Sequence, residues 1–101
     1  MPDLNHLPAV VQALPGPDAT VYVYFADGRI TQYDAKPLIH PGSVFEPLAD
    51  PRVFEGALTV LDGTVAWALD GTRDPATALD IAPEAVYSSP RVSDPLAVRG
   101  A

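Results

Sequence analysis

The chain of 101 residues contains no cysteine, so disulfides, thiolate metal sites and a cysteine nucleophile are excluded. It also lacks an apolar run approaching the roughly 20 residues that span a bilayer, so no membrane association is expected. Residues 1–11 show no basic stretch followed by an apolar one, so a secretory signal is not expected. Together these absences predict a cytoplasmic protein.

Basic residues are scarce as well, with 6 Lys and Arg against 13 Asp and Glu and a formal net charge of −7. They are scattered, and no glycine-rich loop leads into a lysine, so neither a phosphate loop nor nucleic-acid binding is predicted. Such a surface repels phosphate backbones and anionic membranes. The acidic charge has two interpretations: it supports solubility, or it complements a basic partner protein.

Proline, by contrast, is abundant, with 12 residues spread along the chain. Because proline fixes φ and removes a hydrogen-bond donor, a bundle of long helices is excluded. The length fits one domain, and 48% hydrophobic residues suffice for one core. We predict a small single α+β domain over residues 9–88, between a flexible tail at 1–8 and a loose tail at 89–101.

Two antiparallel β-hairpins of the same design are predicted, each turning at an Asp-Gly pair that favours a tight turn. Their strands and turns are residues 20–25, 27–28 and 29–34, then 57–61, 62–63 and 64–69. Asp27 and Asp62 are interpreted as turn formers that bond to the backbone. In the second hairpin Val65, Trp67 and Leu69 are expected to share one face, with Trp67 in the core.

The remaining segments are shorter. A strand is predicted over 9–14, and a proline-broken helix over 45–55, where Asp50 caps the helix and Pro51 takes its first position. Ser43 is expected to cap a turn, and one helical turn can follow Pro83. Residues 70–79 form either a loop or a short helix over 75–79. One or two short helices would thus pack with the two hairpins.

Several of these residues form an ordered set of landmarks: Phe25-Ala26-Asp27-Gly28, Tyr33-Asp34, Phe45-Glu46-Pro47-Leu48-Ala49-Asp50-Pro51, Phe54, Trp67, Asp80-Ile81-Ala82-Pro83-Glu84 and Tyr87. Over roughly residues 8–88 the chain resembles the family of small bacterial proteins called domain of unknown function 2442. Residues 70–79 depart from the pattern as an apparent insertion.

The resemblance implies a compact α+β fold and no established activity. It also implies a small accessory protein encoded beside another short protein, in an arrangement similar to a toxin–antitoxin pair. It carries no catalytic motif onto these positions.

The sequence offers few groups for chemistry. A metal site would require the fold to bring His40 together with Asp34 and Asp50. An alternative function, small-ligand binding or catalysis, would use Asp34, His40 and Asp80. The competing interpretation leaves His40 in a solvated loop and lets the two aspartates cap turns. No nucleophile motif is present, so no enzyme and no cofactor are predicted.

Tyrosines supply the candidate interaction residues, namely Tyr22, Tyr24 and Tyr33. In the first hairpin, alternation puts Val21, Val23 and Phe25 toward the core and Tyr22 and Tyr24 outward. An outward tyrosine pair is either covered by a helix or tail, or it forms a contact surface. The predicted function is therefore an antitoxin-like accessory protein that binds a protein partner or a second copy of itself.

Overall fold

The computed structural model describes residues 7–71 and 77–96. Two three-stranded antiparallel sheets account for its strands. The first sheet has the order β1 (Val10–Pro15), β2 (Thr20–Phe25), β3 (Ile30–Asp34), and the second has the order β4 (Leu58–Leu61), β5 (Thr64–Trp67), β6 (Leu79–Asp80). The helices are the 3₁₀ turns η2 (Lys36–Leu38) and η3 (Glu46–Ala49) and the short helices α1 (Pro51–Ala57) and α2 (Pro83–Tyr87). The predicted fold class, a small α+β domain with two antiparallel hairpins and short helices, is confirmed.

Each hairpin turns at its Asp-Gly pair. In the first, Gly28 has φ of +91° and the Asp27 carboxylate accepts a hydrogen bond from the Arg29 amide at 2.9 Å. In the second, Asp62 and Gly63 have φ of +52° and +74°, the left-handed pair that a two-residue turn of type I′ requires. The predicted turn role of Asp27 is therefore confirmed.

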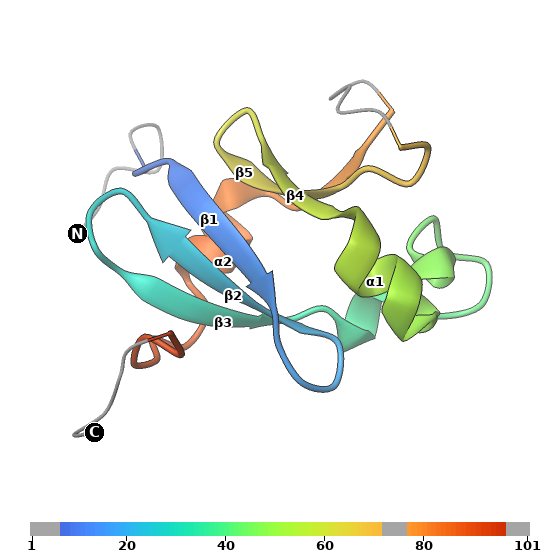
Figure 1. Ribbon diagram of the computed structural model, residues 1–101, viewed down its shortest axis with the longest axis horizontal. Coiled ribbons are helices and arrows are strands. Elements are labelled where there is room, and N and C mark those ends of the chain that lie inside the picture. Colours follow the sequence, from blue (N-terminus) through green and yellow to red (C-terminus); the bar gives the residue numbers. More distant parts are fainter. Residues whose placement is uncertain (1–6, 72–76, 97–101) are drawn as a thin grey trace.

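The core lies between the two sheets and α2. Val21, Val23 and Phe25 are buried on the inner face of the first sheet, and Trp67 is fully buried in the second. The Trp67 indole N–H donates to the Phe54 carbonyl at 3.2 Å, so this large side chain is both packed and satisfied. In Figure 1, α2 lies behind the first sheet, and α1 lies beyond one end of it.

Two buried threonines form hydrogen bonds to the segment that contains α2. Thr64 in β5 donates its hydroxyl to the Ile81 carbonyl, and Thr31 in β3 donates to the Val86 carbonyl, both at 2.8 Å. These bonds satisfy polar groups inside the core, where an unpaired group is costly. They also hold α2 against both sheets.

The proline-broken helix forms as predicted. Residues 46–49 make a 3₁₀ turn, and α1 then begins at Pro51, with the Asp50 carboxylate accepting from the Arg52 amide at 2.9 Å. Proline is tolerated at this first position because its missing N–H has no helical partner to lose. Leu48 and Phe54 are buried, so both pieces contribute to the core.

The second hairpin differs from the prediction at its end. β5 ends at Trp67, and the chain turns there, with the Gly71 amide donating to the Ala68 carbonyl. Leu69 therefore lies outside the strand and is 39% exposed, so the prediction that the strand runs to residue 69, with Leu69 on the face of Val65 and Trp67, is wrong. The two-residue strand β6 was not predicted either. Within the 70–79 segment, residues 72–76 lie outside the described part of the chain.

The C-terminal segment also differs from the expected loose tail. Pro90 accepts a hydrogen bond from the Gln32 amide, and the Val92 amide donates to Ile30, both at 3.0 Å, so that Arg91 pairs with Thr31 along the open edge of β3. Of the predicted N-terminal tail, residues 1–6 lie outside the described residues, and Leu7 packs against the core. Among the helices that the structure describes, none is long and apolar enough to cross a membrane.

Candidate functional site

The outer face of the first sheet carries the side chains that point away from the core. The strand register arranges them in two cross-strand rows, Leu14–Tyr22–Gln32 and Gln12–Tyr24–Ile30. We call the four larger apolar members, Leu14, Tyr22, Tyr24 and Ile30, the tyrosine face. Each of the four is half-buried.

The solvent side of a small antiparallel sheet is ordinarily polar, because only its other side packs on the core. Here two aromatic and two aliphatic side chains occupy neighbouring positions instead. Side chains directly opposite one another in such a sheet contact each other, so Leu14 packs beside Tyr22 and Ile30 beside Tyr24. The result is one contiguous apolar strip with two phenol groups.

Tyr22 is held in position by the β1–β2 turn. A Cβ placed on Gly16 would lie 3.0 Å from the Tyr22 ring and 2.5 Å from the Thr20 hydroxyl oxygen, so the ring packs on bare backbone. Thr20 has little freedom to yield, because its hydroxyl donates to the Pro17 carbonyl at 2.7 Å and accepts from Gln32 at 3.2 Å. The glycine is therefore required by a close approach and not by a positive φ.

Tyr24 is fastened to the C-terminal segment. Its hydroxyl donates to Asp94 Oδ1 at 2.6 Å, and Asp94 Oδ1 also accepts from the Leu96 amide at 2.8 Å. Burial, aided by the bond to the negatively charged Asp94, raises the pKa of Tyr24 to about 12. The C-terminal segment thus covers one end of the tyrosine face and leaves Tyr22 at the other end.

Tyr33, the third predicted interface residue, lies on the opposite side of the sheet. It stands directly across from Val21, half-buried against the core. Burial, the largest cause, and the neighbouring Asp34 charge raise the pKa of its hydroxyl. The structure therefore brings Tyr22 and Tyr24 together and separates Tyr33 from them.

A polar cluster, separate from the tyrosine face, joins the first hairpin turn to α2. The Tyr87 hydroxyl donates to Asp27 at 2.8 Å, and the Arg29 guanidinium lies 4.0 Å from the centre of the Tyr87 ring. Phe25 meets the same ring edge-on at 4.9 Å. The Arg29 amide, with help from the Tyr87 hydroxyl, lowers the pKa of Asp27, and the bond to Asp27 in turn raises the pKa of Tyr87. Each group has a partner within the fold, so the cluster is structural.

The residues considered for metal or catalytic chemistry do not converge. In the described part of the chain, no three His, Asp or Glu side chains are arranged to hold a metal ion. Asp34 accepts from the Lys36 amide and pairs with the Lys36 ammonium at 3.2 Å, which together lower its pKa. His40 is exposed in a separate hollow beside Glu46, and Asp80 belongs to β6 in the other sheet. Asp50 is occupied as the cap of α1.

The contact between Tyr24 and Asp94 was missed by the sequence reasoning. The two residues are 70 positions apart, and no local pattern links them. Ser43, by contrast, has its predicted role: its hydroxyl oxygen accepts from the Phe45 amide at 3.0 Å and its hydroxyl donates to Leu38 at 2.7 Å.

Comparisons of this chain with protein-family models, with curated proteins and with solved structures found no match. The family resemblance of the landmark residues therefore stays a prediction.

Proposed function

We propose that this protein is a small accessory protein that acts by binding another protein through the tyrosine face. The observation that carries the proposal is the contiguous strip of Leu14, Tyr22, Tyr24 and Ile30 on the outer side of the first sheet. Neither the second sheet nor α2 covers this side, since both pack on the inner face. Figure 1 shows the strands in front of α2.

Tyrosine suits such a role physically. Its ring contributes a large apolar contact area at the cost of only two side-chain rotations, and its hydroxyl still offers a hydrogen bond. Among the described residues the Tyr22 hydroxyl makes no hydrogen bond to protein, whereas that of Tyr24 is bound to Asp94. Tyr22 is accordingly the proposed anchor, and Tyr24 the link to the C-terminal segment.

Three aspartates that could serve in chemistry hold the backbone instead. Asp27, Asp34 and Asp50 each accept a backbone hydrogen bond from the residue two positions on, which is a turn-forming or capping role. This engagement favours a binding module over a catalytic one.

The net charge of −7 favours a partner whose contact surface has an apolar centre and a basic rim. We propose that the complex forms in the cytoplasm and that the first partner to test is the short protein encoded by the neighbouring gene. An antitoxin-like pairing of this kind would suit a small domain whose described residues form no cluster that could hold a metal ion.

The test is to co-express the two proteins, purify them and measure their dissociation constant by calorimetry. Tyr22→Ala should weaken binding by roughly 30-fold or more, the effect of losing an interface anchor. Val44→Ala is the matched control, because Val44 is 67% exposed and lies outside the tyrosine face. Thermal unfolding of each variant separates lost contact from lost fold.

Light scattering on the protein alone tests whether a second copy is the partner. Self-association that Tyr22→Ala abolishes would support the same face with the chain as its own partner. If the wild-type protein is strictly monomeric and the neighbouring protein does not bind, or if both variants bind like the wild type, the proposal is wrong.

A further inference from the structure

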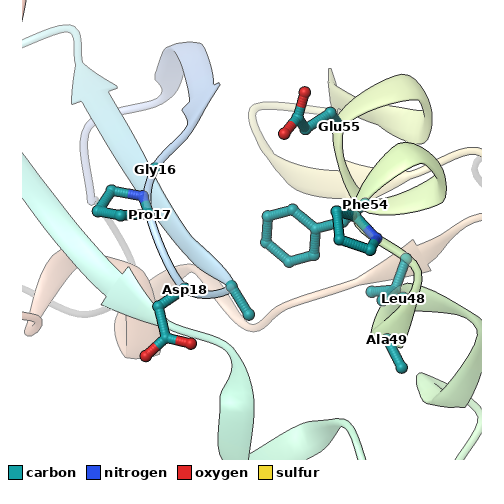
Figure 2. Close-up of a pocket in the computed structure, with 9 residues that line it drawn as sticks. Gly16, Pro17, Asp18, Leu48, Ala49, Phe54 and Glu55 are labelled. Atoms are coloured by element: carbon teal, nitrogen blue, oxygen red, sulfur yellow. The ribbon is translucent and has the colours of Figure 1, made fainter.

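A cleft on another part of the molecule has a different chemistry from the tyrosine face. It lies between the β1–β2 turn on one side and η3 with α1 on the other, and its volume is about 300 Å³. Figure 2 shows the Phe54 ring directed from α1 toward the turn, with Asp18 on the turn and Glu55 on the helix. Sites for whole small ligands begin near this volume, so the cleft suits one long side chain.

The floor of the cleft is apolar and already formed. Leu48 and Phe54 line the cleft and are only 2% and 4% exposed, so the core holds both side chains in place. Pro17 lines one wall, and proline restricts the backbone there. A bound alkyl chain would therefore meet a surface that needs little rearrangement.

The rim of the cleft carries an excess of negative charge. Asp18 and Glu55 are both exposed carboxylates on its opposite walls. Lys36 lies 3.1 Å from Asp18, but it lies 3.2 Å from Asp34 as well, so one ammonium is shared between two carboxylates. Glu55 has no ion pair among the described residues. The combination of apolar floor and anionic rim is complementary to a group with an apolar stem and a cationic head.

We propose that this cleft binds an arginine side chain presented by a protein partner, with its stem on Phe54 and Leu48 and its guanidinium between Asp18 and Glu55. Arginine fits better than lysine because its planar guanidinium presents several N–H donors to carboxylates and is more weakly hydrated than an ammonium. The proposal concerns a surface separate from the tyrosine face and does not rest on the proposed function.

The test uses n-butylguanidinium chloride as a probe for the arginine side chain. It is titrated into the full-length ¹⁵N-labelled protein while amide chemical shifts are recorded. Saturable shifts confined to the β1–β2 turn and the 48–55 segment are expected, with a dissociation constant on the order of 10 mM for a ligand of so few atoms. n-Butanol, which has the stem without the charge, should bind markedly more weakly, and added salt should weaken only the guanidinium.

Two variants remove the charges while preserving the backbone. Asp18→Asn suits this purpose because Asp18 has φ of +56°, and asparagine tolerates that left-handed conformation. Glu55→Gln changes an exposed helical side chain. Each should weaken probe binding by about two- to fivefold, the effect of one exposed charge pair. Lys36→Gln should strengthen binding, because it frees the Asp18 carboxylate.

Asp62→Asn is the matched control, since Asp62 has the same left-handed conformation in the other hairpin turn and should leave binding unchanged. Glu55→Gln keeps the test valid if Asp18→Asn disturbs its turn. Equal binding of probe and butanol, shifts that map elsewhere, or wild-type affinity in both charge variants would each overturn the proposal.

Discussion

Two tyrosines that alternate with buried valines along β2 have different surroundings, and the difference depends on single neighbours. Tyr24 is bound through its hydroxyl to Asp94, whereas Tyr22 rests on the bare backbone of Gly16. Alternation along the strand predicts that both point outward, and they do. Alternation does not predict what each ring contacts. Tyr22 meets the β1–β2 turn, and Tyr24 meets Asp94, which is 70 positions away along the chain.

Gly16→Ala should destabilise the fold by about 1–3 kcal/mol, because the added methyl group overlaps the Thr20 hydroxyl and the Tyr22 ring. Gly56→Ala is the matched control: nothing lies within 4 Å of its Cβ position, in the last turn of α1. That substitution should stabilise the protein by up to about 1 kcal/mol, since alanine is the better helix former. Urea denaturation measures both, and an unchanged midpoint for Gly16→Ala would contradict the close approach.

At the scale of elements, the parts that could be predicted from the sequence are those with a local signal. The hairpins follow from alternating β-branched and aromatic residues around Asp-Gly turns, and the start of α1 follows from Asp50-Pro51. β6 has two residues and the C-terminal pairing is a single bridge between Arg91 and Thr31, so neither is long enough to show a periodicity. Both form because a neighbouring strand offers unpaired backbone groups, which is a property of the assembled sheet.

The C-terminal segment covers part of the open edge of β3 and also fixes Tyr24, so the two effects should be lost together. Val92→Pro removes the amide that donates to Ile30, whereas Val92→Ala shortens the side chain and keeps that amide. In Val92→Pro we expect faster amide hydrogen exchange at Gln32, by about fivefold for a bond of roughly 1 kcal/mol.

The same variant should lower the pKa of Tyr24 from about 12, because the segment that carries Asp94 is detached; burial of the ring keeps part of the shift. Because the pKa of Tyr24 is raised in the folded state, the stability that the protonated Tyr24 hydroxyl contributes is complete below pH 10 and is lost toward pH 12. Tyrosine absorbance titration, with Tyr24→Phe to assign the transition, measures the change. If Val92→Ala and Val92→Pro titrate alike, the backbone pairing does not hold the segment.

At the scale of the whole molecule, the chain carries a formal net charge of −7, and its acidic residues are not equivalent. In three of them, Asp27, Asp34 and Asp50, a hydrogen bond accepted from the backbone amide two positions on is the main cause of a lowered pKa. These carboxylates lie at a hairpin turn, at the end of β3 and at the start of α1. Their ionised forms therefore support three separate parts of one cooperative fold.

Acid should therefore destabilise the protein in a defined range of pH. Because the folded pKa values are lowered, the unfolded chain binds more protons once the pH nears the ordinary aspartate value of about 3.9. The free energy of unfolding should be constant above about pH 5, fall as the pH drops through 4, and level off only below the folded pKa values. Urea denaturation from pH 7 to 2.5 measures this, at low protein concentration because the sequence pI is about 4.4.

The triple variant Asp27→Asn, Asp34→Asn, Asp50→Asn should flatten this acid dependence, since asparagine retains much of the capping ability but does not ionise. A charge-matched variant, Asp62→Asn, Asp80→Asn, Glu84→Gln, should keep the wild-type profile, because it leaves all three backbone bonds intact. If both triple variants respond to acid alike, acid sensitivity comes from net charge spread over the surface. A difference between them assigns it to the three turn and cap carboxylates.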